Sequence, residues 1–145
     1  IPLLLKISPD IHESHTSEIV DVILKNSISA IVLTNTTNSN KNNLKDKAKN
    51  ESGGLSGEPL QQISTNMIKK FYKLLNGKIP IIGVGGVNSG KSAYEKIIAG
   101  ASLLQLYTGF VYRGPSTAKE IKKELIQILK NEGIKNIKDA IGKGI

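Results

Sequence analysis

Small polar residues and glycines follow four apolar segments of this chain, where the strands of a parallel sheet end and binding sites usually form. These positions are Lys6-Ile7-Ser8, Thr34-Asn35-Thr36-Thr37, Gly83-Val84-Gly85-Gly86 and Tyr107-Thr108-Gly109. Glycines let backbone N–H groups approach an anion closely, while amides and hydroxyls hydrogen-bond a planar polar ligand. The four positions together predict a ligand site at one edge of a sheet.

The glycine turn at Gly83–Gly86 is the most informative of these positions. In barrels of alternating strands and helices, the loops after the last two strands commonly bind a phosphate group. We therefore expect Gly85, Gly86 and the Tyr107-Thr108 turn to hold one phosphate from two sides, helped by the positive end of a helix that begins near Gly90. The alternative is that the glycines only allow a strand and a helix to pack closely.

Lys6 is the second residue that indicates a ligand site, because the ammonium group of a lysine within an apolar strand must reach water or a partner. Pointing into a site, it would offer a fixed positive charge to an electron-rich centre; otherwise it is one more solvated lysine. Asn35 and the two threonines after it could bind a ligand or simply form a turn. The segment Gly53-Gly54-Leu55-Ser56-Gly57 is either a second backbone donor loop or a hinge.

Composition excludes several other classes of site. The 145 residues contain no cysteine, so a disulfide framework and a thiolate metal site are excluded. The two histidines, His12 and His15, are interpreted as exposed residues at a helix start, and no metal site is predicted. The net charge is +8, yet Arg113 is the only arginine, so sequence-specific nucleic-acid binding is not expected. No apolar run approaches the roughly 20 residues that span a bilayer.

Apolar strands and amphipathic helices alternate along the chain. The pattern predicts strands at 3–7, 30–34, 79–83 and 102–106, each buried on both faces. It predicts helices after Ser14–Ser17, over 60–75, after a Ser89 cap, from Gly114-Pro115, and a last short turn at 137–141. The fold class is therefore α/β with a parallel sheet, and the four strand-helix units match either half of a (β/α)₈ barrel or a complete open sheet. A polar, Asn- and Lys-rich segment within 35–58 predicts a flexible loop at about 38–52.

Five motifs, in order, resemble the second half of dihydroorotate dehydrogenases, and the resemblance covers the whole chain. They are Lys6-Ile7-Ser8-Pro9-Asp10, Thr34-Asn35-Thr36-Thr37, Gly53-Gly54-Leu55-Ser56-Gly57, Ile81-Ile82-Gly83-Val84-Gly85-Gly86 and Gln105-Leu106-Tyr107-Thr108. The last motif and the ending Asp139-Ala140-Ile141-Gly142 are similar to the class 2, quinone-dependent branch. The resemblance implies one domain over residues 1–145, the C-terminal half of an FMN-binding barrel.

The resemblance also implies roles for individual residues. Lys6 would contact FMN and stabilise the charge on the reduced flavin, and Asn35 and Thr36 would bind orotate. The other expected FMN contacts are Thr34, Ser56, Gly57, Val84, Gly85, Gly86, Tyr107 and Thr108. The phosphate would lie on Gly85, Gly86, Tyr107 and Thr108.

The family's activity is the oxidation of dihydroorotate to orotate in pyrimidine synthesis, with quinone as the electron acceptor. Its catalytic base, a serine, lies in the first half of the barrel, and its membrane-associating helical pair also belongs to the N-terminal part, which we expect as a partner of this chain. The implied location is the mitochondrial inner membrane, or the cytoplasmic membrane of a bacterium. The alternatives are another phosphate-binding barrel flavoenzyme or isomerase, and a basic module that binds polyanions without being an enzyme.

Overall fold

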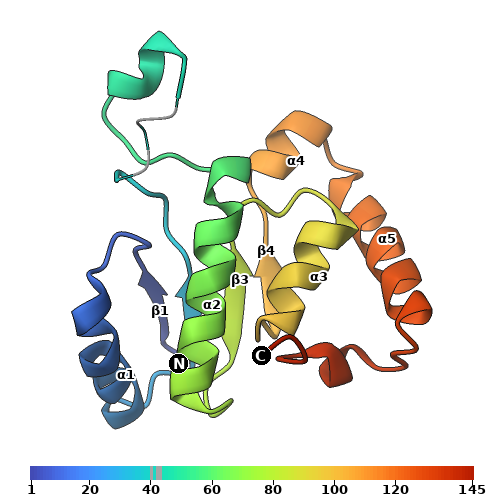
Figure 1. Ribbon diagram of the computed structural model, residues 1–145, viewed down its shortest axis with the longest axis horizontal. Helices are drawn as coiled ribbons and strands as arrows, with labels where there is room; N and C mark the ends of the chain where they lie inside the picture. Colours follow the sequence, from blue (N-terminus) through green and yellow to red (C-terminus); the bar gives the residue numbers. More distant parts are fainter. Residues whose placement is uncertain (40, 42–43) are drawn as a thin grey trace.

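The computed structural model describes residues 1–39, 41 and 44–145, and its centre is a parallel sheet of four strands (Figure 1). The strands are β1 (Leu4–Ile7), β2 (Ala30–Leu33), β3 (Ile81–Val84) and β4 (Leu103–Gln105). They lie side by side in the order of the chain, and every neighbouring pair is parallel. The carboxyl ends of all four strands therefore lie at the same edge of the sheet.

A helix follows each strand, as the alternating pattern predicts. The main helices are α1 (Thr16–Lys25), α2 (Gln61–Leu75), α3 (Gly90–Ile98) and α5 (Thr117–Asn131). In Figure 1, α2 lies in front of the sheet between α1 and α3, and α5 packs outside α3. Short helical turns complete the fold: η1 (Glu13–His15), η2 (Lys47–Asn50), η3 (Glu58–Leu60), α4 (Thr108–Arg113) and η4 (Ile137–Ala140).

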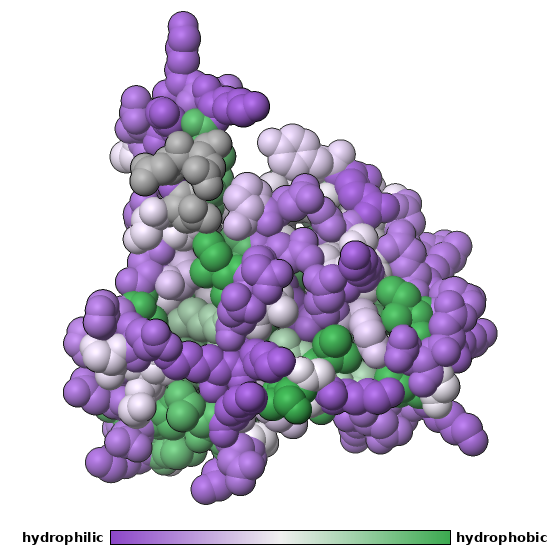
Figure 2. All heavy atoms as spheres, in the orientation of Figure 1, coloured by the Kyte–Doolittle hydropathy of each residue, from purple (hydrophilic) through white to green (hydrophobic). Residues whose placement is uncertain are grey.

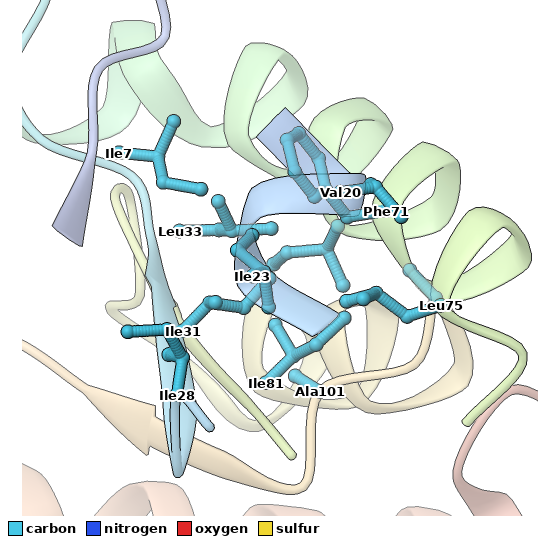
Figure 3. Close-up of a cluster of buried hydrophobic side chains, with 12 residues drawn as sticks. Ile7, Val20, Ile23, Ile28, Ile31, Leu33, Phe71, Leu75, Ile81 and Ala101 are labelled. Carbon is cyan, nitrogen blue, oxygen red and sulfur yellow. The ribbon is translucent and has the colours of Figure 1, made fainter. Parts of the chain in front are cut away.

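The main hydrophobic core lies between the sheet and the helices α1 and α2 (Figure 3). Alternate strand residues such as Ile31, Leu33 and Ile81 point toward these helices, because side chains alternate between the two faces of a strand. They meet Ile23 and Phe71, which are both fully buried. The opposite face carries a smaller cluster formed by Ala30, Val32, Ile82 and Val84.

The two outer strands differ from the prediction that all strands are buried on both faces. Leu4 and Leu5 on β1 are 45 % and 36 % exposed, and Leu103 on β4 is 62 % exposed. Among the described residues, β1 pairs only with β2, and β4 only with β3. The prediction is confirmed for β2 and wrong for β1 and β4, because continuous apolar sequence cannot tell a central strand from an edge strand of the same sheet.

Two helix starts also differ from the predictions. Residues Tyr107-Thr108-Gly109 were expected as a turn, but Thr108 begins α4, and the expected helix from Gly114-Pro115 begins later, at Thr117. Before α1, the short η1 intervenes, and its cap is His12, whose ring nitrogen accepts from the Ser14 N–H. Both histidines are exposed, as expected for residues at a helix start.

Ser89 caps α3 as predicted, and it forms a capping box with Ser92. The Ser89 hydroxyl accepts from the Ser92 N–H at 3.2 Å, while the Ser92 hydroxyl accepts from the Ser89 N–H at 3.0 Å. Replacing Ser89 with alanine is expected to lower the free energy of unfolding by about 1 kcal/mol, the usual loss for a helix cap. Urea denaturation measures it, with the exposed Ser17→Ala as control; equal midpoints for both variants would contradict the assignment.

The predicted loop at about 38–52 leaves the body of the protein next to the site and contains η2 (Figure 1). Its base is closed by Thr37 and Leu55, which exchange backbone hydrogen bonds of 3.1 and 2.7 Å. Asp10 also holds this base, accepting from the Thr37 hydroxyl at 2.5 Å and the Asn38 N–H at 2.7 Å. Residues 40, 42 and 43 of the predicted loop lie outside the described residues.

Figure 2 shows that hydrophilic side chains cover most of the face seen in Figure 1, with hydrophobic residues in the gaps between elements. Lys119, Lys122, Lys123 and Lys130 on α5 are all exposed. Within the described part of the chain, no helix is long and apolar enough to cross a membrane.

Candidate functional site

A cavity of about 180 Å³ lies at the carboxyl ends of the four strands. Every residue predicted for the site lines it: Lys6, Thr34, Asn35, Thr36, Ser56, Gly57, Val84, Gly85, Gly86, Tyr107 and Thr108. The parallel sheet explains the convergence, because each of these residues lies on a strand, in a loop or at a helix start at that edge. The structure therefore brings these residues together, and their roles as contacts to a ligand stay predictions.

Backbone hydrogen bonds hold the strand ends in register around this cavity. The Asn35 N–H donates to the Ile7 carbonyl at 2.8 Å, and the Thr34 N–H donates to the Val84 carbonyl at 3.1 Å. The first bond joins the ends of β1 and β2, and the second joins the ends of β2 and β3. Thr34, Asn35 and Val84 thus have fixed relative positions before any ligand binds.

The Thr34 hydroxyl is the unsatisfied polar group of this site. Thr34 is 2 % exposed, and of the buried side-chain oxygens and nitrogens in the described residues, its Oγ1 is the one without a hydrogen-bond partner. A buried hydroxyl without a partner costs free energy, so native proteins retain one chiefly where a ligand or water completes it. Thr34 lines the cavity, so this unpaired hydroxyl lies beside the space that a ligand would fill.

Gly85 and Gly86 form the turn at the end of β3, with φ angles of 111° and 71°. Residues with a Cβ rarely adopt these angles. A Cβ on Gly86 would lie 2.4 Å from the Gln61 Cβ and 2.7 Å from its Cα, and one on Gly85 would lie 3.2 Å from the Ser64 Cβ. The first turns of α2 therefore pack directly against bare backbone, and the other side of this turn is left open to a ligand.

The segment 53–57 reaches across to the other side of the cavity. The Ser56 and Thr108 hydroxyls lie 3.0 Å apart, so this loop contacts the start of α4. A second cavity of about 580 Å³ adjoins the first and shares Gly57, Gly86 and Thr108 with it. The two cavities together offer more room at this edge of the sheet than the first cavity alone.

Lys6 carries the only charge among the described residues that line the first cavity. In the register of the sheet it is paired with Val32, which is paired with Ile82, so Lys6 lies on the face opposite α1 and α2. Asn35 is exposed at the mouth, and its Oδ1 accepts from the Thr36 N–H at 2.9 Å. This bond fixes the Asn35 side chain and leaves its NH₂ group for a ligand acceptor.

The predicted contribution of the α3 N-terminus to anion binding is wrong. Glu124 of α5 accepts from the Gly90 N–H at 2.5 Å, and the Ser89 and Ser92 hydroxyls accept from other amides of the first turn. A carboxylate already occupies the positive end of this helix. Anion binding at this edge must therefore depend on the glycine turn and on the hydroxyls around it.

Sequence reasoning missed the apolar part of the cavity wall, formed by Leu60, Val87 and Leu106. Each of them is next to or near a predicted site residue in the sequence, and this proximity is the sequence signal that could have identified them as part of the wall. It also missed Asp10, which sits within a recognised motif and holds the base of the loop at Thr37. Burial opposes ionisation of Asp10, but hydrogen bonds from Thr37, Asn38 and Ser39 outweigh it and hold the pKa below the usual 3.8.

Among the described residues, no cluster of three His, Cys, Asp or Glu side chains occurs that could hold a metal ion. The site offers hydroxyls, an amide, glycine backbone and one ammonium group, a donor set that suits a phosphate and a flat heterocycle better than a cation.

Known proteins provide an independent comparison. Residues 1–129 match the family described as dihydroorotate dehydrogenase. The mitochondrial dihydroorotate dehydrogenase (quinone) of Arabidopsis thaliana is 47 % identical over 97 % of this chain and 31 % of its own length. The corresponding mouse protein is 46 % identical over 97 % of this chain and 35 % of its own length.

A solved structure is similar as well. The ligand-free dihydroorotate dehydrogenase of Eimeria tenella superposes with a TM-score of 0.93 at 42 % identity, covering 97 % of this chain and 39 % of that one. The chain thus spans about a third to two fifths of the length of the relatives it matches, and its sheet is part of a (β/α)₈ barrel. The prediction of the quinone-dependent branch is confirmed by the relatives, and the chain belongs to the dihydroorotate dehydrogenase family.

Proposed function

We propose that this chain supplies the FMN-phosphate and orotate contacts of a quinone-dependent dihydroorotate dehydrogenase. The whole enzyme would oxidise dihydroorotate to orotate in pyrimidine synthesis. The chain covers only part of the relatives' length, so this activity would belong to the assembled protein. The observation that carries the proposal is the buried Thr34 hydroxyl without a partner, which lines a cavity beside two glycines that leave room for a ligand.

The residues present fit FMN. A phosphate needs several N–H and O–H donors around it, and the Gly85-Gly86 backbone with Thr108 and Ser56 can supply them from two loops. The isoalloxazine ring needs hydrogen-bond partners along one edge, for which Thr34 and Lys6 are suitably placed on neighbouring strands. When bound, FMN supplies a two-electron acceptor for the hydride of dihydroorotate and passes the electrons on to a quinone.

Lys6 would stabilise the negative charge that the site gains during the reaction. Its ammonium group is a fixed positive charge on the same face of the sheet as the cavity, so it needs no rearrangement to act. Charge placed in advance where negative charge develops is a large contribution in enzymes. The Asn35 NH₂ group and the Thr36 hydroxyl would orient the carboxylate and ring of the substrate beside it.

We assign neither the catalytic base nor the quinone contacts to this chain. The oxidation of dihydroorotate also releases a proton, and the base that accepts it would come from the rest of the barrel. Because quinones are lipid-soluble, the assembled enzyme would work at the mitochondrial inner membrane or a bacterial cytoplasmic membrane. The relatives include both mitochondrial and bacterial proteins.

The test is to express the protein at its full natural length and to ask whether it purifies with FMN. With dihydroorotate and a soluble quinone analogue, it should form orotate, measured by its ultraviolet absorbance. Bound FMN without dihydroorotate oxidation would favour a different flavoenzyme. A protein that binds neither FMN nor inorganic phosphate would contradict the proposal.

Replacing Asn35 with alanine should raise the KM for dihydroorotate about tenfold, because a hydrogen bond to a charged substrate contributes roughly 1.5–3 kcal/mol. FMN content should stay unchanged. The control is Asn38→Ala, an exposed asparagine outside the cavity lining whose backbone N–H, not its side chain, binds Asp10. An Asn35 variant with unaltered KM would remove Asn35 from the substrate site.

A further inference from the structure

Lys96 on α3 is a buried cation that the proposed function does not use. Its side chain is fully buried, and its Nζ lies near three oxygens of α2: the Ser64 hydroxyl at 3.0 Å, the Thr65 hydroxyl at 3.1 Å and the Gln61 carbonyl at 3.3 Å. An ammonium group has three N–H donors, so all three are satisfied. None of the three acceptors carries a charge.

No carboxylate among the described residues forms an ion pair with this ammonium group. Glu95, its neighbour on α3, instead accepts from the Gln61 side-chain NH₂ at 2.7 Å. Burial lowers the pKa of Lys96 from 10.5 to about 8, and Glu95 offsets only part of this effect. The folded chain therefore disfavours the charged form of Lys96, and the positive charge does not stabilise the fold.

The contacts of Ser64 connect Lys96 to the cavity. Besides accepting from Lys96, the Ser64 hydroxyl lies 2.5 Å from the Val84 carbonyl oxygen, to which it donates. The Val84 carbonyl also accepts from the Thr34 N–H, so this oxygen joins the ends of β2 and β3. Lys96, Ser64 and Val84 thus form a continuous chain of hydrogen bonds from α3, through α2, to the residue before the glycine turn.

Packing adds a second connection between these elements. The missing side chains of Gly85 and Gly86 leave room for Ser64 and Gln61, and both of these residues contact Lys96. The three hydrogen bonds of Lys96 therefore tie together the segment of α2 that forms the back of the glycine turn. A shift of Ser64 or Gln61 would move the backbone that faces the ligand.

We propose that Lys96 is a positioning residue for the cofactor site: it fixes Ser64 and Gln61 behind Gly85-Gly86 and so fixes the turn on which the phosphate binds. The inference rests on the proposed function in one respect, that the ligand on this turn is the phosphate of FMN. A positively charged donor polarises the Ser64 hydroxyl and strengthens its bond to Val84, which a neutral side chain cannot do.

The test compares Lys96→Met with Lys91→Met, an exposed lysine on the same helix, in the full-length protein. Calorimetric titration with FMN and with riboflavin, which lacks the phosphate, separates the turn from the ring site. Lys96→Met should weaken FMN binding about tenfold and riboflavin binding less than twofold. The phosphorus-31 resonance of bound FMN should move in Lys96→Met and stay in place in Lys91→Met.

A double-mutant cycle with Ser64→Ala tests the route. If Lys96 acts through Ser64, the double variant should bind FMN within twofold of Lys96→Met alone. If the Lys96 variant does not fold, the single variant Ser64→Ala on α2 is used for the same comparison of FMN binding with riboflavin binding. Equal losses for FMN and riboflavin that follow a lower melting temperature would identify Lys96 as a purely structural residue and overturn the proposal.

A measurement without ligand separates this inference from the proposed function. Amide hydrogen exchange of a peptide spanning residues 84–87 should be faster in Lys96→Met than in the wild type, at an unchanged melting temperature. If the wild type binds no FMN, the proposed function fails while this exchange still decides the role of Lys96. Unchanged exchange in that peptide would overturn the positioning role.

Discussion

Replacing Lys6 with methionine is expected to slow the reduction of bound FMN by dihydroorotate by about 100- to 1,000-fold, with little change in folding. The magnitude is typical for removing one group that is aimed at developing charge. Lys6 is exposed on the edge strand β1 and forms no ion pair among the described residues, so its removal should change the free energy of unfolding by only about 0.5 kcal/mol.

Anaerobic stopped-flow spectroscopy of the full-length protein measures this rate directly. Lys119→Met is the matched control, because Lys119 is an exposed lysine on α5, away from the cavity lining. The control should keep the wild-type rate. A Lys6 variant whose flavin is reduced within threefold of the wild-type rate would show that the ammonium group has no electrostatic role.

The second large effect is expected at Gly86, where alanine should weaken FMN binding at least 100-fold. The new Cβ would lie 2.4 Å from the Gln61 Cβ and 2.7 Å from the Gln61 Cα. The second contact is with backbone, so no side-chain rotation relieves it, and α2 or the glycine turn must move. A 100-fold loss corresponds to about 2.7 kcal/mol of binding free energy.

Gly133→Ala separates the close contact from backbone strain. Gly133 has a φ of 67°, close to the 71° of Gly86, but a Cβ there would meet nothing within 4 Å. Both variants should lose about 1–2 kcal/mol of stability from the left-handed backbone, whereas only Gly86→Ala should lose FMN in a calorimetric titration. Equal FMN affinities in the two variants would contradict the assigned role of the turn.

The position of the site could be predicted from sequence because it depends on topology alone. Once the strands are parallel, Lys6, Thr34, Val84 and Tyr107 must approach the same edge of the sheet, whatever the details of packing. The capping role of Ser89 was also predictable, since capping depends on residues close in sequence. Both features depend on local pattern or on strand direction.

The features that were missed depend on contacts between distant residues. Whether β1 is covered depends on its neighbours in the sheet, and the occupied N-terminus of α3 depends on Glu124, which is 34 residues from Gly90. The missing partner of Thr34 cannot be inferred from its own motif. In each case the sequence specifies the residue, and the tertiary structure specifies what that residue contacts.

Sequence analysis does not single out Lys96, although a signal for its burial exists in the sequence. Ala93, Lys96, Ile97 and Gly100 recur at spacings of three and four, which places Lys96 on the apolar stripe of its helix. This spacing indicates that Lys96 is buried, whereas its charge alone favours an exposed position.

The order of the strands has a consequence for how the chain folds during synthesis. Among these four strands, each of β1, β2 and β3 pairs with the strand that follows it in the chain, so none of these three pairings needs a partner from far away in the sequence. Such local pairing lets each new strand and helix add to a template already formed as the chain leaves the ribosome. The strand synthesised last lies at the edge of the sheet that is still growing. Its exposed apolar residues, such as Leu103 on β4, form a surface on which the nascent chain can mispair.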